Sequence, residues 1–224
     1  MNILLTNDDG YLAEGINLLF DLLSKKHNVV IVAPKEVMSA KSVSIIIRRD
    51  VEVKKINDHL FAMDGTPADC VAFGLSSLNT KFDLVVSGCN HGLNVSYDTM
   101  YSGTIGAGLQ ALTYRIPALA VSCDSNFDIV SKYFDSVLSY IEKNKLLSKE
   151  HLVSVNFPLG EEVKEIKMTH IYYREDTTYY IHKEGNNYYA LRDLHDSECK
   201  DEDSDVYAVY HNIISITKIR KALD

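Results

Sequence analysis

The first 150 residues alternate short apolar runs with segments whose apolar residues recur at helical spacing. This alternation is typical of a parallel β-sheet with helices packed on both of its faces. The apolar runs predict strands at residues 2–6, 28–33, 83–87 and 118–123. The helical spacing predicts helices at residues 14–26, 67–78, 103–114 and 127–147. We therefore predict an α/β fold, with a three-layer core around a mostly parallel sheet.

One helix start is marked by its own residues. Thr66 stands where the N-cap of the predicted helix 67–78 falls, and Pro67 and Asp69 occupy its first and third positions. A hydroxyl at the N-cap and a carboxylate in the first turn satisfy free backbone N–H groups and complement the helix dipole. The sequence therefore predicts a capped helix that begins at Pro67.

The chain changes character near residue 150. Nine of its eleven glycines lie at or before Gly108, whereas eight of its fourteen tyrosines lie after residue 150. We predict a catalytic core at residues 1–150 and a β-rich C-terminal portion at residues 151–224, with an arm used in oligomerisation. Further strands are expected at 164–173, 177–183, 187–192 and 206–217. Residues 44–63 predict short strands, from Ser44-Ile45-Ile46-Ile47 onward, that form a hairpin beside the main sheet.

Composition limits the partners of the chain. A formal charge of −8, with scattered basic residues, argues against binding to long nucleic acids. No apolar run approaches the roughly 18 to 20 residues that span a bilayer, so no membrane association is expected. The four cysteines show no C-x-x-C spacing, and the first residues read as a core strand rather than a signal peptide. These features predict a cytoplasmic protein.

Polar residues gather where the predicted parallel strands end, which is where open α/β sheets bind ligands. Asp8 and Asp9 follow the first strand, a loop with Ser39 and Ser42 follows the second, and Asn90 follows the third. Adjacent carboxylates repel unless a cation lies between them, and oxygen-only ligands suit Mg²⁺ or Mn²⁺ rather than zinc. The alternative for the two aspartates is a turn that caps a helix.

A second pattern, Tyr101-Ser102-Gly103-Thr104-Ile105-Gly106-Ala107-Gly108, leads into the helix predicted at 103–114. Small residues leave the first N–H groups of a helix open to an anion, so a phosphate fits here; plain capping by Ser102 is the alternative. Leu109-Gln110 replaces the Lys-Ser/Thr of a P-loop. Val95 stands where a thiol phosphatase using Cys89 would need arginine, and no Asp-x-Asp follows the first strand. Water is therefore the expected nucleophile.

These segments resemble the SurE family, the stationary-phase survival nucleotidases. The resemblance rests on six ordered motifs within the first 125 residues: Ile3-Leu4-Leu5-Thr6-Asn7-Asp8-Asp9-Gly10, Ala33-Pro34 with Ser39 and Ser42, Gly65-Thr66-Pro67-Ala68-Asp69-Cys70-Val71, Val86-Ser87-Gly88-Cys89-Asn90-His91-Gly92-Leu93-Asn94, Tyr101-Ser102-Gly103-Thr104, and Pro117-Ala118-Leu119-Ala120-Val121-Ser122. Val153-Ser154-Val155-Asn156-Phe157-Pro158 and Ile214-Ser215-Ile216-Thr217 match more weakly. Ala40 and Ser96 stand where the family usually has glycine, and Lys218 where it usually has proline.

The resemblance implies a Rossmann-like core and hydrolysis of nucleoside monophosphates, with 5′- and also 3′-nucleotides as substrates. It implies one divalent cation per subunit, Mg²⁺ or Mn²⁺, and a homodimer or homotetramer with an exchanged C-terminal hairpin. The implied metal ligands are Asp8, Asp9, Ser39 and Asn90. The implied phosphate contacts are Asn94, Ser102, Gly103, Thr104 and Ser42.

We expect metal-activated water to attack the phosphoryl group, with Asp8 and Asp9 as the catalytic residues and Asp8 orienting or deprotonating the water. His91 either protonates the leaving group or is a loop residue bonded to backbone. Two other classes remain open at this point: a nucleotide-sensing protein without turnover, and a phospho-receiver module. A receiver needs an acceptor aspartate after a middle strand, where this chain has Asn90.

Overall fold

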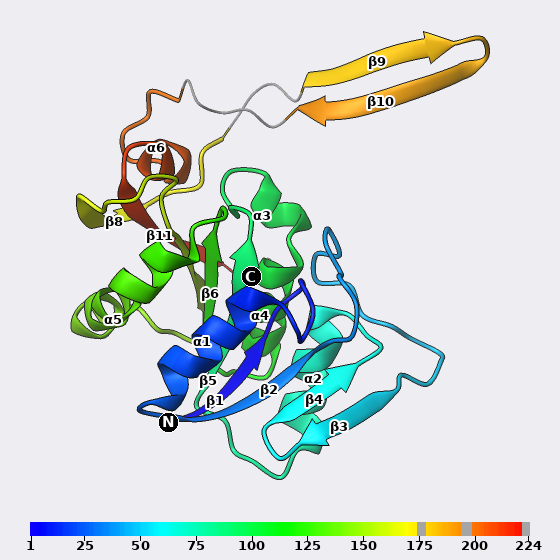
Figure 1. Cartoon of the computed structure of the whole chain (residues 1–224), viewed down its shortest axis with the longest axis vertical. Helices are drawn as coiled ribbons and strands as arrows, with labels where there is room; N and C mark the ends of the chain where they lie inside the picture. Colours follow the sequence, from blue (N-terminus) through cyan, green and yellow to red (C-terminus); the bar gives the residue numbers. More distant parts are fainter. Residues whose placement is uncertain (174–177, 194–198, 221–224) are drawn as a thin grey trace.

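A computed structural model describes residues 1–173, 178–193 and 199–220 of the chain. Within these residues one large sheet is built from β1 (Asn2–Thr6), β2 (Asn28–Pro34), β3 (Val53–Asn57), β4 (Leu60–Met63), β5 (Leu84–His91), β6 (Ala118–Cys123), β7 (His151–Asn156), β8 (Glu165–Thr169) and β11 (Ile213–Arg220). Their order is β3-β4-β2-β1-β5-β6-β7-β11-β8 (Figure 1). The pairs β3–β4 and β7–β11 are antiparallel and the other pairs are parallel, which confirms the predicted mostly parallel sheet.

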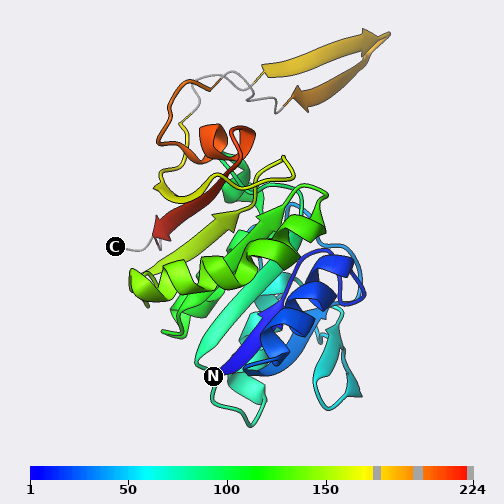
Figure 2. The same cartoon turned by 60° about the vertical axis from the view of Figure 1, so that its left-hand side comes forward.

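Helices cover both faces of this sheet (Figures 1 and 2). α1 (Glu14–Ser24) and α5 (Phe127–Lys143) pack on one face, and α2 (Pro67–Ser77) and α4 (Gly103–Thr113) on the other. Two short helices complete the described set, α3 (Asp98–Tyr101) before α4 and α6 (Asp205–Tyr210) before β11. In the described ranges no helix combines the length and the apolar character needed to cross a membrane.

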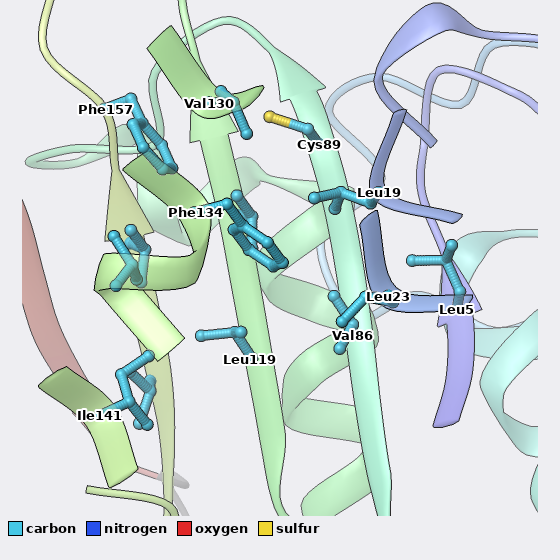
Figure 3. Close-up of a cluster of buried hydrophobic side chains, with 14 of the residues drawn as sticks. Leu5, Leu19, Leu23, Val86, Cys89, Leu119, Val130, Phe134, Ile141 and Phe157 are labelled. Carbon is cyan, nitrogen blue, oxygen red and sulfur yellow. The ribbon is translucent and has the colours of Figure 1, made fainter. Parts of the chain in front are cut away.

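Alternating side chains of the central strands supply two hydrophobic cores. Along β1, Leu5 faces the core under α1 and α5, whereas Leu4 faces the core under α2 and α4. Figure 3 shows the first of these cores, where Leu19 of α1 and Phe134 of α5 lie over the sheet. The sheet therefore needs apolar residues on both faces, which explains the continuous apolar runs of its central strands.

The predicted cap of α2 is confirmed. The hydroxyl of Thr66 accepts a hydrogen bond from the Asp69 N–H (3.1 Å), and the Asp69 carboxylate accepts one from the Thr66 N–H (3.0 Å). Pro67 occupies the first helical position. This reciprocal pair satisfies two N–H groups that an uncapped helix leaves without a partner.

Two predictions about strands are wrong. Ser44–Ile47 is not a strand, because its backbone bonds to the start of α2: the Ser44 carbonyl accepts from the Thr66 hydroxyl (2.6 Å), and the Ile46 N–H donates to Asp69. The segment 206–217 is not one strand either. Its first part is α6, because the Ser204 side chain caps it by accepting from the Tyr207 N–H (3.1 Å), and β11 begins only at Ile213.

The sheet continues beyond residue 150, since β7, β11 and β8 all belong to it. The predicted strands at 177–183 and 187–192 are confirmed as β9 (Thr178–Glu184) and β10 (Asn187–Asp193), with residue 177 outside the described residues. These two strands form a separate antiparallel hairpin that projects from the core in both views (Figures 1 and 2). Within the described strands, only this hairpin stands apart from the main sheet.

The buried ring of Phe134 offers a test of the core under α5. We expect Phe134→Ala to lower the free energy of unfolding by about 3–5 kcal/mol, because it removes a large side chain and leaves a cavity. Ser136→Ala, at an exposed position of the same helix, is the matched control and should change the value by less than about 0.5 kcal/mol. Urea unfolding measures both; equal losses in the two variants would contradict the packing described.

Candidate functional site

A cavity of about 250 Å³ opens at the carboxyl ends of the parallel strands. The chain leaves β1 toward β2 on one side and β5 lies on the other side of β1, so the cavity sits where the strand order reverses. Open α/β sheets bind ligands at such a switch point. The residues that line the cavity are Asp8, Ser39, Ala40, Asn90, His91, Asn94, Asp98, Tyr101 and Ser102.

The two aspartates after β1 differ in their partners. Asp8 is 4% exposed, and its Oδ1 accepts a hydrogen bond from the Thr104 hydroxyl (2.5 Å). Asp9 accepts one from the His91 N–H (3.0 Å). Burial raises the pKa of Asp8 to about 6, against the Thr104 bond and with the help of the Asp9 charge. Burial also raises the pKa of Asp9, against its bond to His91.

An irregularity near the end of β5 determines where Asn90 lies. The register with β6 shifts between Ser87 and Asn90, and Gly88 has a φ of +128° there. A Cβ at Gly88 would lie 2.2 Å from the Val121 carbonyl oxygen, so the shift requires glycine. The Asn90 Nδ2 donates to the Gly92 carbonyl (2.7 Å), which leaves Oδ1 as the atom of this amide for a ligand in the cavity.

The loop after β2 carries Ser39 and Ser42 and is tied to the site by backbone hydrogen bonds. The Met38 N–H donates to the Asp8 carbonyl (2.7 Å), and the Ser42 N–H donates to the Tyr101 carbonyl (2.9 Å). Ser39 lines the cavity, whereas Ser42 does not. Ala40 and Ser42 have φ values of 57° and 51°, which is the region that favours glycine.

The start of α4 lies against Asp8. The Ser102 hydroxyl oxygen accepts from the Ile105 N–H (3.1 Å) as the N-cap, so its own proton remains for another acceptor. A Cβ at Gly103 would lie 2.9 Å from the Oδ2 of Asp8, so only glycine lets the helix approach this closely. The Thr104 hydroxyl is engaged by Asp8, so this residue faces the carboxylate with its side chain.

Asn94 is held by residues of two further strands. Its N–H donates to the Asn156 Oδ1 (2.7 Å), and its carbonyl accepts from the Asn156 Nδ2 (3.0 Å). Its own Nδ2 donates to the Ser122 hydroxyl (2.9 Å). Asn94 is 5% exposed, so both its backbone and its side chain have fixed partners at the wall of the cavity.

The structure thus brings the predicted residues to one place in two layers. Asp8, Ser39, Asn90, Asn94 and Ser102 line the cavity. The other four do not line it, but each contacts a residue that does: Asp9, Ser42, Gly103 and Thr104.

Asp98 also lines the cavity and is a site residue that the sequence reasoning missed. Its position between Asn94 and the Tyr101-Ser102-Gly103-Thr104 motif was the available signal. Two residues that line the cavity are aspartates and none is lysine or arginine. In the described residues no cluster of three or more His, Cys, Asp or Glu side chains is placed to hold a metal ion, so any cation here takes hydroxyl and amide oxygens as well.

The fold and the cavity define a Rossmann-like α/β protein with an acidic, oxygen-lined site at the switch point of its sheet. A family model described as "Survival protein SurE" matches residues 3–178. The chain belongs to the SurE family.

Relatives and solved structures agree with this assignment. The chain is 38% identical to a protein named 5′-nucleotidase SurE from Clostridium botulinum (strain Loch Maree / Type A3), over 98% of this chain and 92% of that protein. It is 36% identical to the protein of the same name from the Alaska E43 / Type E3 strain, over 98% and 93%. The crystal structure of the SurE protein from Aquifex aeolicus superposes with a TM-score of 0.86 at 30% identity and covers 100% of this chain and 95% of that one.

The positive φ of Ala40 gives a test of the loop after β2. We expect Ala40→Gly to raise the free energy of unfolding by about 0.5–1 kcal/mol. The left-handed backbone strains alanine, and relief of this strain exceeds the stability lost because glycine gives the unfolded chain more conformational entropy. Ala72→Gly in α2 is the matched control and should lower it by about 0.8–1 kcal/mol. Both are measured by urea unfolding, and the loop geometry is wrong if the two changes have the same sign.

Proposed function

We propose that this chain is a 5′-nucleotidase that hydrolyses nucleoside monophosphates, including 3′-nucleotides, with the help of one divalent cation, Mg²⁺ or Mn²⁺. The curated relatives named 5′-nucleotidase SurE support the class of reaction. One observation carries the proposal for this chain: the cavity at the start of α4 is lined by two aspartates and by no lysine or arginine. A phosphate monoester is an anion, so a cation must offset these carboxylates before it binds.

The residues present fit such a cation. Asp8, Ser39 and Asn90 line the cavity and would supply a carboxylate, a hydroxyl and an amide carbonyl. Asp9 follows Asp8 directly and would supply a second carboxylate, one oxygen of which accepts from the His91 N–H. This is an all-oxygen donor set, which suits Mg²⁺ or Mn²⁺ better than zinc. When bound, the cation offsets the charge that develops on the phosphoryl oxygens and makes water more acidic.

The chain itself then binds and orients the ester. The Ser102 hydroxyl and the Gly103 N–H at the start of α4 would donate to the phosphoryl oxygens, and Asn94 completes this wall. Gly103 lets the helix start lie against Asp8. Asp8, held by the Thr104 hydroxyl, orients the attacking water or accepts its proton, and Asp9 is held by the His91 backbone.

We also propose a homodimer or homotetramer in the cytoplasm. The β9–β10 hairpin stands away from the core with Tyr188 and Tyr189 67% and 51% exposed, which suits an arm that packs on another subunit (Figure 1). The four cysteines are free, as expected in a reducing compartment. Size-exclusion chromatography with light scattering measures the assembly.

Removal of the cation tests the function directly. We expect release of phosphate from AMP in the presence of Mn²⁺ to be abolished by EDTA and restored by excess Mn²⁺.

Asp8→Asn should lower kcat by at least about 100-fold, because it removes a charged ligand and the proton acceptor. Asp21→Asn, at an exposed position of α1, is the matched control with unchanged kcat. AMP binding without release would favour a nucleotide sensor instead.

The hydrogen bond from Thr104 to Asp8 gives a second test. We expect Thr104→Val to lower kcat/KM for AMP about tenfold or more, since a hydrogen bond to a charged group contributes about 1.5–3 kcal/mol. Thr113→Val at the other end of α4 removes a hydroxyl bonded only to a helix carbonyl and should leave kcat/KM unchanged. Equal kcat/KM in the Thr104 variant and the wild type would mean that this bond does not hold the reactive carboxylate.

A further inference from the structure

Two buried polar side chains from beyond residue 150 hold the loop that carries Asn94. Asn156, at the end of β7, uses both atoms of its amide on the backbone of Asn94, at 2.7 and 3.0 Å. Asp205, at the start of α6, accepts from the Ser96 N–H at 2.9 Å. Both side chains are 1% exposed, so neither contact is a surface bond that water can replace.

The carboxylate of Asp205 joins this loop to the chain at the foot of the hairpin. Its Oδ1 accepts from the Tyr172 N–H and from its own neighbour, the Val206 N–H, both at 2.8 Å. The Ser96 hydroxyl donates to the Tyr172 carbonyl (3.0 Å), so Ser96 and Tyr172 are joined directly as well as through Asp205. Burial raises the pKa of Asp205, and the hydrogen bonds from these N–H donors oppose that rise.

The held loop leads straight into the cavity. The Asp98 N–H donates to the Val95 carbonyl (3.1 Å), and the Thr99 hydroxyl donates to the Ser96 carbonyl (2.7 Å), so α3 starts from the loop. α3 ends at Tyr101, directly before the N-cap of α4. A shift of Ser96 therefore moves the part of the cavity wall between Asn94 and Ser102.

We infer that Asn156 and Asp205 are positioning residues of the active site, which act through the backbone of Asn94 and Ser96. Neither of them lines the cavity. Their hydrogen bonds fix the loop that presents Asn94 and Asp98, so the C-terminal part of the chain completes the phosphate-binding wall. The kinetic part of this inference rests on the proposed phosphatase function, and its structural part does not.

Near-isosteric variants separate the hydrogen bonds from packing. Asn156→Asp removes the donor to the Asn94 carbonyl, and Asp205→Asn places N–H groups against N–H donors. We expect each to lower kcat/KM about tenfold or more for AMP and for p-nitrophenyl phosphate alike, and to raise the inhibition constant of inorganic phosphate. The two substrates share only the phosphate group. An equal fold-loss of kcat/KM for both therefore points to the part of the cavity wall that binds phosphate.

Controls come from the same elements. Ser154→Ala, two residues before Asn156, removes a buried hydroxyl that has no partner, and Asp203→Asn changes an exposed carboxylate beside α6. Val209→Ala loosens the small apolar cluster that packs Val206 against Val95. These variants should keep kcat/KM within about twofold of wild type, even where Val209→Ala lowers the Tm as much as the positioning variants do. The inference is overturned if Asn156→Asp and Asp205→Asn also stay within about twofold, or if Val209→Ala loses as much.

Hydrogen exchange tests the structural part without any activity. In the wild-type protein the Asn94 and Ser96 amides should exchange as slowly as strand amides of β5, and fast exchange there would overturn the inference whether or not the variants fold. In the positioning variants these two amides should lose protection while β1 and β5 keep theirs. If the wild type releases no phosphate with any divalent cation, the proposed function fails, and the exchange data alone decide the role of Asn156 and Asp205.

Discussion

Two adjacent carboxylates at the end of a buried strand constrain this structure more than any other feature. Asp8 is almost fully buried, and the charge of the half-buried Asp9 beside it adds to the rise in the pKa of Asp8. Two separate elements donate hydrogen bonds to these carboxylates: α4 through the Thr104 hydroxyl and β5 through the His91 N–H. The loop after β2 is held to the same place by the Met38 N–H. This pair of residues therefore contacts three elements, two through its side chains and the third through the Asp8 carbonyl.

The parts of the fold that follow from local chemistry could be predicted from the sequence. Apolar runs gave the central strands because both faces of the sheet are buried, and a reciprocal pair, Thr66 and Asp69, marked the start of α2. The residues that line the cavity could be predicted from the sequence for a similar reason. Parallel strands end at one edge of a sheet, so polar residues that follow successive strands must meet there. Asp8, Ser39 and Asn90 meet at the cavity for this reason.

Contacts between distant segments could not be predicted from the sequence. Ser44–Ile47 has the composition of a strand, yet its backbone bonds to the start of α2. A local signal was also missed: α6 contains valines and tyrosines that favour strands, but the side chain of Ser204 caps it as a helix by accepting from the Tyr207 N–H. The hydrogen bond from the Thr104 hydroxyl to Asp8 also joins residues that are far apart in the chain. Each outcome depends on a partner far away in the chain or on a cap that outweighs weak β propensity.

The backbone at Ala40 and Ser96, where the resemblance to the SurE family predicts glycine, bears on how the site is held. Ala40 and Ser96 have φ values of 57° and 51°, so the backbone keeps a left-handed turn even where a side chain makes it costly. Around Ser96 the reason is visible: its N–H bonds to Asp205, its hydroxyl bonds to the Tyr172 carbonyl, and its carbonyl accepts from Thr99. The buried Asp205 carboxylate accepts three N–H groups, and loss of any of these bonds would leave a buried polar group without a partner, so this contact favours a fixed loop. The strain at Ser96 is then evidence that the surrounding bonds, and not the local sequence, set the position of Asn94.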